Sequence, residues 1–157
     1  MSDLDFDAPD ADAMRALGVR FARALVVTGS REPALVVLSG ELGAGKTTFV
    51  AGVLAALGHT GAVRSPTYTL IEPYELAGRA VYHADLYRLR HPDELEDLGL
   101  RDLLQGDALV FVEWPERAEG RLGTPDLSLD FGYAGDTARR VSMRPQSMFG
   151  QTVLQHI

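Results

Sequence analysis

The chain has 157 residues, a formal net charge of −7 and no cysteine. This length predicts a single domain over residues 1–157 that buries enough surface to fold without disulfides or a structural metal, with no room for a second substrate-binding domain. The lack of cysteine excludes disulfides and thiolate metal sites, and the acidic chain, which has no basic run, is a poor candidate for direct, tight binding to a nucleic-acid backbone.

No part of the sequence indicates a targeting or membrane segment. Residues 1–7 are acidic and lack the basic end and apolar core of a signal peptide. No stretch approaches the ~18 apolar residues that a membrane span requires. We therefore expect a cytoplasmic protein without membrane contact.

The first part of the chain predicts a helix, a buried strand, a glycine-rich loop and a second helix. Apolar residues recur at helical spacing over residues 9–27. Residues 34–38 form a short, nearly continuous apolar run, which is typical of a strand buried on both faces of a sheet. The glycine-rich segment 40–47 follows at once, and residues 47–57 predict a helix that Gly58 ends.

Strands and short helices follow in the middle of the chain. Residues 67–72 and 80–85 predict two strands joined by a hairpin, because the turn-forming segment 77–79 separates them. A helix is expected to begin at residues 92–97, where a proline precedes acids that suit the positive end of a helix. Residues 100–104 are expected to be helical as well.

The last third contains a second buried strand and a second hairpin. Residues 108–112 repeat the short apolar run, and residues 126–131 and 137–143 alternate in character around a turn, which predicts an antiparallel hairpin. The tail, residues 145–157, has no strong period and is expected to pack loosely. Together the elements predict an α/β fold in three layers, with a mostly parallel central sheet and antiparallel hairpin strands at its edges.

The only lysine of the chain is Lys46, and the other 14 basic residues are arginine. Lys46 stands near the end of the segment Gly-Glu-Leu-Gly-Ala-Gly-Lys-Thr. A compact ammonium can enter a narrow ring of backbone amides and contact two phosphates, whereas a planar guanidinium is too broad. The single lysine therefore indicates a chemical requirement at this position.

The surrounding loop has the composition of a phosphate site. Gly40, Gly43 and Gly45 allow backbone angles that point N–H groups inward, and the next helix adds its positive end. The hydroxyl of Thr47 is a ligand for Mg²⁺. A strand before the loop and a helix after it predict a P-loop NTPase fold. The chain has no asparagine and thus lacks the Asn-Lys-x-Asp motif by which GTP-binding proteins recognise guanine, so ATP is favoured over GTP.

Two acids follow buried strands and are candidates for the metal site. Asp85 ends the strand at 80–85, and Glu113 comes directly after residues 108–112. Ligands of parallel sheets bind beyond the carboxyl ends of the strands, so both acids reach one edge if their strands run parallel to the strand before the loop. We expect Asp85 to hold Mg²⁺ through water and Glu113 to lie against the metal and polarise the attacking water. A helix cap or a surface salt bridge is the alternative for each acid.

Three further residues lie near these motifs. Thr67 follows a Ser-Pro pair and is a candidate for sensing the γ-phosphate, although an ordinary turn explains the segment equally well. Trp114 is expected to pack beside the metal site. His83 and Asp85 are two apart and so face the same side of their strand, which alone makes no metal site. The start of the first helix, residues 10–14, is a candidate edge of the base pocket.

Four motifs occur in order along the chain: Gly-Glu-Leu-Gly-Ala-Gly-Lys-Thr-Thr-Phe at 40–49, Ser-Pro-Thr-Tyr-Thr-Leu at 65–70, Tyr-His-Ala-Asp-Leu-Tyr-Arg-Leu at 82–89 and Val-Glu-Trp-Pro-Glu at 112–116. In sequence and spacing they closely resemble the TsaE (YjeE) family of bacterial P-loop ATPases. The resemblance covers about residues 9–143. With the TsaB, TsaC and TsaD proteins, this family serves the synthesis of threonylcarbamoyladenosine at position 37 of tRNAs.

The resemblance implies a role for each matching residue. The ATP or ADP site would comprise Gly40, Glu41, Leu42, Gly43, Ala44, Gly45, Lys46, Thr47 and Thr48, together with Trp114. It implies that Lys46, Glu113 and Thr67 serve catalysis and that Thr47, Asp85 and Glu113 serve Mg²⁺. It also implies docking on TsaB and TsaD, with hydrolysis resetting that assembly between rounds and tRNA contacted only through the partners.

Two other functions fit the same loop. A P-loop small-molecule kinase needs an acceptor pocket and a lid with phosphate-binding arginines. Arg117 and Arg121 are candidates for that lid, but the segment around them is short and acidic. The second of these functions is a nucleotide-sensing module without turnover. It differs from a slow ATPase mainly in that partners do not stimulate hydrolysis.

Overall fold

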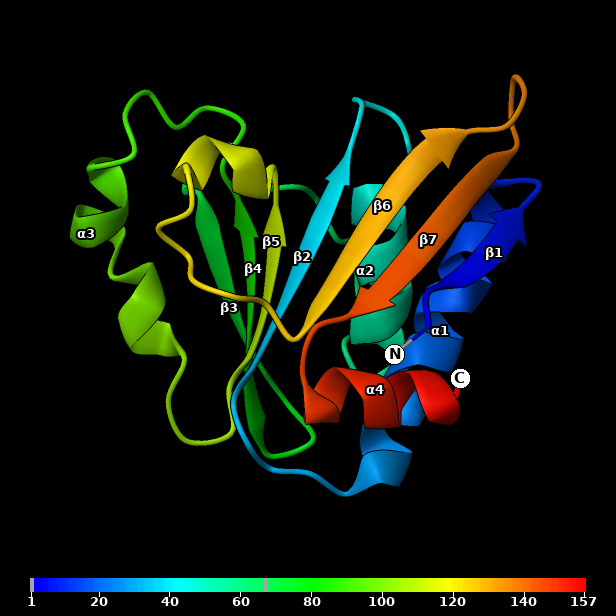
Figure 1. Ribbon diagram of the computed structural model, residues 1–157, viewed down its shortest axis with the longest axis horizontal. Coiled ribbons are helices and arrows are strands. Elements are labelled where there is room, and N and C mark those ends of the chain that lie inside the picture. The colour runs from blue at the N-terminus through cyan, green and yellow to red at the C-terminus, as the bar shows by residue number, and fades with distance from the viewer. Residues whose placement is uncertain (1, 67) are drawn as a thin grey trace.

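The computed structural model describes residues 2–66 and 68–157 (Figure 1). The strands are β1 (Leu4–Ala8), β2 (Ala34–Gly40), β3 (Ile71–Leu76), β4 (Arg79–Asp85), β5 (Leu109–Glu113), β6 (Leu127–Tyr133) and β7 (Arg139–Pro145). The helices are α1 (Ala11–Thr28), α2 (Lys46–Ala56), α3 (Glu94–Leu98) and α4 (Met148–Gln155), with 3₁₀ segments η1 (Leu100–Leu103) and η2 (Pro115–Ala118).

Within the described residues, the strands form one seven-stranded sheet in the order β1-β7-β6-β2-β5-β4-β3. The four central strands β6, β2, β5 and β4 run parallel, and the edge strands β1, β7 and β3 pair antiparallel with their neighbours. The structure thus confirms the expected α/β fold, with its mostly parallel centre and antiparallel edges.

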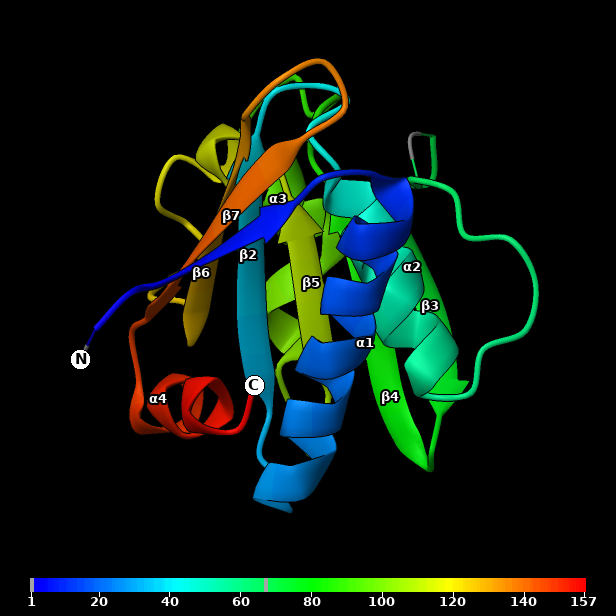
Figure 2. The ribbon, with the colours of Figure 1, turned by 90° about the vertical axis from the view of Figure 1, so that its right-hand side faces the viewer.

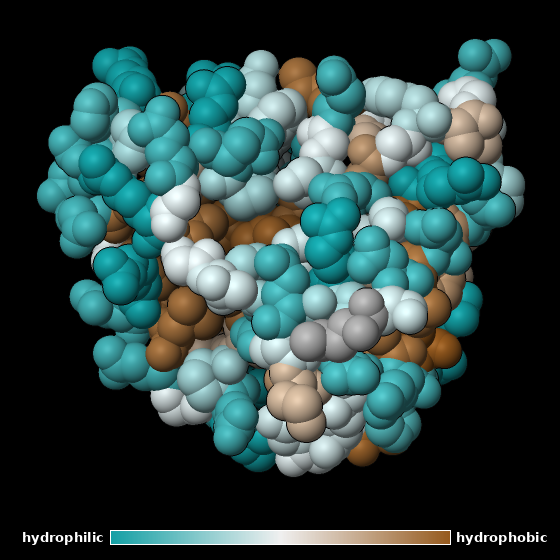
Figure 3. Space-filling model, viewed as in Figure 1, coloured by the Kyte–Doolittle hydropathy of each residue, from teal (hydrophilic) through white to brown (hydrophobic). Residues whose placement is uncertain are grey.

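Alternate residues of the central strands enter cores on opposite faces of the sheet. In β2, Val36 and Leu38 belong to the core under α1 and α2, whereas Leu35 and Val37 belong to the core under α3, η1 and η2. Figure 2 shows α1 and α2 together on one side of the sheet. This two-sided burial explains why the strand is nearly continuously apolar in sequence. On the face seen in Figure 3, hydrophobic residues lie mainly in recesses between hydrophilic ones.

Helices α1 and α2 pack closely because glycines face each other's backbone. A Cβ on Gly18 would lie 2.2 Å from the Phe49 carbonyl oxygen, and one on Gly52 would lie 2.1 Å from the Arg15 oxygen. No larger side chain fits there without moving one helix. This packing fixes α2, and with it the loop that precedes α2, against the sheet.

Three expectations about the elements were wrong or incomplete. Residues 4–8 form β1, which had not been expected, and β3 begins at Ile71, later than expected. The tail does not pack loosely: it forms α4, where Ser147 accepts a hydrogen bond from the Gly150 N–H and caps the helix. Val153 and Leu154 of α4 are buried in the core shared with α1.

Candidate functional site

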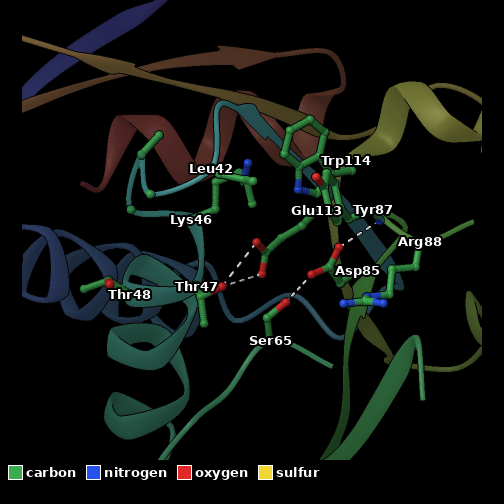
Figure 4. Close-up of a pocket in the computed structure, with 13 residues that line it drawn as sticks. Leu42, Lys46, Thr47, Thr48, Ser65, Asp85, Tyr87, Arg88, Glu113 and Trp114 are labelled. Carbon is green, nitrogen blue, oxygen red and sulfur yellow. Dashed lines mark hydrogen bonds between the residues drawn. The ribbon is translucent and has the colours of Figure 1, made fainter. Parts of the chain in front are cut away.

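The glycine-rich loop joins the carboxyl end of β2 to the amino end of α2. It borders a cavity of about 390 Å³, whose lining is drawn in Figure 4. The lining residues are Leu42, Gly43, Ala44, Gly45, Lys46, Thr47, Thr48, Ser65, Asp85, Tyr87, Arg88, Glu113 and Trp114. Gly45 precedes α2 with a φ of 107°, a left-handed conformation that favours glycine. The structure therefore gathers the loop, both candidate acids and Trp114 around one cavity.

Lys46 is held inside this cavity by oxygen atoms and an aromatic ring. Its ammonium donates to the carbonyl oxygens of Gly40 and Glu41, the latter at 3.3 Å. It also lies 4.1 Å from the centre of the Trp114 ring, within the range of a cation–π contact. Gly40 and Glu41 thus contribute carbonyl groups rather than part of the cavity wall.

Burial lowers the pKa of the Lys46 ammonium from its ordinary value of 10.5, because desolvation penalises the charged form. The carboxylates of Glu113, Glu116, Asp85 and Glu41 oppose this shift. The side chain is only 4% exposed. A desolvated cation at a helix amino end attracts a polyanion, whereas the surrounding carboxylates repel it, so a bound cation would be needed to offset them.

Asp85 and Glu113 are brought together by the register of two parallel strands. β4 and β5 pair so that Asp85 lies directly opposite Glu113, and β2 runs parallel to β5. Both acids therefore stand at the carboxyl edge where β2 enters the loop, as the sequence predicted. Their side chains are buried, with exposures of 6% and 3%.

Glu113 receives hydrogen bonds from two directions. The Thr47 hydroxyl lies 3.0 Å and 3.2 Å from its two carboxylate oxygens. His83 Nε2 lies 2.5 Å from Oε2, and the imidazole is fully buried. The carboxylate is therefore held between the first turn of α2 and the middle of the sheet.

Asp85 is oriented by a second set of donors. The Ser65 hydroxyl donates to its Oδ2, and the backbone N–H of Tyr87 donates to Oδ1 at 2.9 Å. Figure 4 shows Ser65 and Asp85 pointing toward each other, beside the pair formed by Thr47 and Glu113. The acid is thus fixed at both oxygens.

The donor set fits Mg²⁺. Thr47, Asp85 and Glu113 offer hard oxygen atoms at one cavity, and Mg²⁺ uses one or two carboxylates together with waters and phosphate oxygens. In the part of the chain that the structure describes, no three His, Cys, Asp or Glu side chains gather as a metal cage.

Trp114 has an unusual backbone conformation directly after Glu113. Its φ of 58° and ψ of 50° place it in the left-handed region, which costs about 1 kcal/mol or more for a non-glycine residue. The ring packs against Tyr87 at a centroid distance of 4.9 Å and covers the Lys46 ammonium. The turn thus aims the indole into the cavity.

The structure adds residues that the sequence reasoning assigned no role. Ser65, Tyr87 and Arg88 all line the cavity. Arg88 is exposed and its guanidinium lies 5.0 Å from the Tyr68 ring centre. Its position three residues after Asp85 was the available signal. Thr67 lies outside the described residues.

A smaller cavity of about 100 Å³ adjoins the other side of the loop. Asp10 and Met14 from the start of α1 line it, together with Thr48, Thr137 and Arg139. The start of α1 therefore borders the loop, where a base-pocket edge had been expected. Among the described helices, none is long and apolar enough to span a bilayer.

Comparison with known proteins gives consistent matches over most of the chain. The family model "Threonylcarbamoyl adenosine biosynthesis protein TsaE" matches residues 8–141. The "tRNA threonylcarbamoyladenosine biosynthesis protein TsaE" of Haemophilus influenzae is 41% identical over 146 residues, covering 93% of this chain and 92% of that protein. The protein of the same name from Streptomyces coelicolor is 44% identical over 132 residues, covering 82% and 85%.

A solved structure agrees with these sequence matches. The crystal structure of Bacillus subtilis YdiB superposes with a TM-score of 0.75 at 26% identity and covers 99% of this chain and 96% of that one. The chain therefore belongs to the TsaE family and has its P-loop fold.

Proposed function

We propose that this protein is a Mg²⁺-dependent ATPase that acts in the biosynthesis of tRNA threonylcarbamoyladenosine. Membership of the TsaE family and the names of its relatives support the pathway. The observation that carries the ATPase proposal is one cavity in which the desolvated Lys46 ammonium, the Thr47 hydroxyl and two buried carboxylates face each other.

Each group has a chemical task in this proposal. Lys46 contacts the β- and γ-phosphates of ATP, and residues 42–48 cradle them with backbone N–H groups. Thr47, Asp85 and Glu113 would hold Mg²⁺, which would compensate phosphate charge. Glu113 also orients the water that attacks the γ-phosphate.

Thr67 is proposed to sense the γ-phosphate. Trp114 covers Lys46 and is proposed to contact the nucleotide. The smaller cavity beside Asp10 and Met14 is proposed to receive the base, because it opens next to the loop glycines. These assignments place the base on one side of the loop and the metal on the other.

The proposed partners are TsaB and TsaD. Hydrolysis resets their assembly between catalytic rounds, and the tRNA is contacted only through them, in the cytoplasm. The net charge of −7 supports this division of labour, because an acidic protein gains little from a phosphate backbone. Slow turnover alone and faster turnover with partners follow from this role.

A reconstitution with TsaB, TsaC, TsaD and tRNA tests the proposal. We expect the chain to raise the number of modified tRNAs per TsaD above one, and the ATPase rate to rise in parallel. Glu113→Gln is the matched control, because it keeps the shape of the site but loses the carboxylate. Multiple rounds of modification at full rate with this variant would contradict the coupling of hydrolysis to reset.

A small-molecule kinase is the other function to test. The two arginines considered for a lid are already engaged, since Arg121 pairs with Asp93 and Arg117 lies 5.5 Å from the Tyr87 ring centre. The ATPase is therefore the better supported reading. A metabolite that becomes phosphorylated in the presence of the chain and ATP would reverse this choice.

A further inference from the structure

His83 is a buried polar side chain in the middle of the sheet. It lies on β4, where its neighbours in register are Glu72 of β3 and Phe111 of β5. Its exposure is 0%, and it is not part of the cavity lining. Burying an imidazole among apolar side chains costs free energy unless it makes hydrogen bonds. The contacts of its imidazole nitrogens therefore decide whether this burial is compensated.

Within the described residues, the His83 side chain makes one hydrogen bond, which runs to Glu113. Nε2 lies 2.5 Å from Glu113 Oε2, and Nδ1 has no partner within residues 2–66 and 68–157. An ionised carboxylate only accepts, so the proton in this bond belongs to Nε2. A proton on Nδ1 would have no acceptor among these residues, which favours the tautomer that donates to Glu113.

The geometry makes His83 a second anchor for the Glu113 side chain. Thr47 approaches the carboxylate from α2, and His83 approaches it from β4. With donors on two sides, rotation about the side-chain torsions of Glu113 would break at least one hydrogen bond. Without His83, only the Thr47 contact in this set would restrain the carboxylate.

We propose that His83 is a positioning residue that holds Glu113 in its working orientation through Nε2. This inference rests on the proposed ATPase function, because it concerns the same carboxylate. His83 itself does not contact nucleotide, since the residue lies behind Glu113 and outside the cavity lining. It thus affects the rate of hydrolysis and leaves nucleotide affinity nearly unchanged.

Two amide variants of His83 differ in reach alone. In His83→Gln the side-chain amide extends about as far as Nε2 and can donate to Glu113, whereas in His83→Asn it ends near the position of Nδ1. Removing a partner that orients a metal-site ligand typically lowers activity about 10–100-fold. We expect that loss in single-turnover ATP hydrolysis by His83→Asn, and a rate within about threefold of the parent for His83→Gln.

Three further measurements separate positioning from a structural role. ADP affinity is expected to stay within about twofold of the parent in both variants, since the loop residues are untouched. In a Glu113→Gln background, His83→Asn should slow hydrolysis no further, because the residue it positions is already lost. Crystals of the nucleotide-free His83→Asn chain should show Glu113 rotated away from its place in the parent.

Several results would overturn the proposal. The first is an ATP hydrolysis rate of His83→Asn equal to that of the parent. The second is an equal loss of hydrolysis rate in both variants together with weaker ADP binding, since that is the pattern of a damaged fold. If His83→Asn does not fold, a His83→Gln rate as low as that of Glu113→Gln is the overturning result. A parent chain that hydrolyses no ATP, alone or with partners, refutes the proposed function itself.

Discussion

Replacing Lys46 by methionine removes one charge from the cavity and keeps most of the side-chain volume. In the free protein the ammonium is 4% exposed and contacts two carbonyl oxygens and the Trp114 ring. In the proposed complex with ADP, the same ammonium faces the β-phosphate. The substitution therefore affects the free and the bound protein in opposite directions.

The loss of nucleotide affinity follows from these two states. A unit charge about 4 Å from a phosphate charge contributes about 4 kcal/mol at an effective dielectric constant near 20. Giving up the carbonyl and ring contacts costs about 1.5 kcal/mol of this. The net loss of about 2.5 kcal/mol corresponds to a rise of about 70-fold in the Kd for ADP.

The stability of the nucleotide-free chain should change the other way. Because burial lowers the pKa of Lys46 below 10.5, the folded chain holds this proton less tightly than the unfolded chain does. The charged lysine therefore destabilises the fold at neutral pH. Lys46→Met should unfold at the same or a higher denaturant concentration, and its advantage should shrink as the pH rises from the lowered pKa toward 10.5.

Isothermal titration with ADP and Mg²⁺, paired with urea unfolding, measures both effects. Arg101→Met is the matched control, because it removes one exposed cation far from the loop and changes the net charge equally. Lys46→Arg should also fail to support turnover, since the guanidinium is too broad for the seat between the carbonyls and Trp114. Unchanged ADP affinity in Lys46→Met would refute the assignment of Lys46 to the phosphates.

Three other substitutions test separate parts of the molecule. Glu113→Gln should slow single-turnover ATP hydrolysis about 100-fold or more while ADP still binds, and parental phosphate release would contradict its role. Asp85→Ala should weaken the Mg²⁺ dependence of ATP binding more than it weakens ADP affinity. If Mg²⁺ raised the ATP affinity of this variant as much as it raises that of the parent, a metal role for Asp85 would be contradicted. Arg79→Met should lower the free energy of unfolding by about 1–3 kcal/mol and leave ADP affinity unchanged. The reason is that the buried guanidinium donates to the carbonyls of Asp107, Ser30 and Glu32, at the end of the sheet away from the loop. An unshifted urea midpoint would contradict this.

The central strands could be predicted because consecutive residues of each strand are apolar. Alternate side chains of β2 and β5 both meet apolar cores, so an unbroken apolar run was sufficient to identify them. β1 gave no comparable signal. Its acidic residues alternate with Leu4 and Phe6, which is the period of a strand with one exposed face, but this pattern covers only five residues, and Leu4 pairs with Met143 at the far end of the chain. Such long-range pairing overrides local propensity.

The helix α4 shows the same limit at the other end of the chain. Its buried residues, Gly150, Val153 and Leu154, lie at helical spacing, but this period covers only eight residues and one of its positions is a glycine, so it was not recognised from the sequence. Gly150 is required for another reason, since a Cβ there would lie 2.1 Å from the Asp126 carbonyl oxygen. The helix therefore depends on close packing near β6 that the local pattern does not display.

The loop of the candidate site could be predicted because its residues are contiguous. Residues 42–48 line one cavity because they follow one another through a single turn, so their spacing and composition are sufficient to predict it. Ser65 and Arg88 could not be placed in this way. Ser65 reaches Asp85 because of the path of the segment between α2 and β3, and Arg88 reaches the cavity after β4 has ended.

Register supplies what the sequence could not state about the acids and His83. Alternation along β4 puts Val81, His83 and Asp85 on one face, and Val81 enters the core under α1 and α2. Ala84, on the other face, packs in the opposite core. A slip of β4 by one residue would exchange these faces and turn His83 away from Glu113. The apolar partners of β4 therefore specify the His83–Glu113 contact, so the core and the proposed chemistry depend on the same strand alignment.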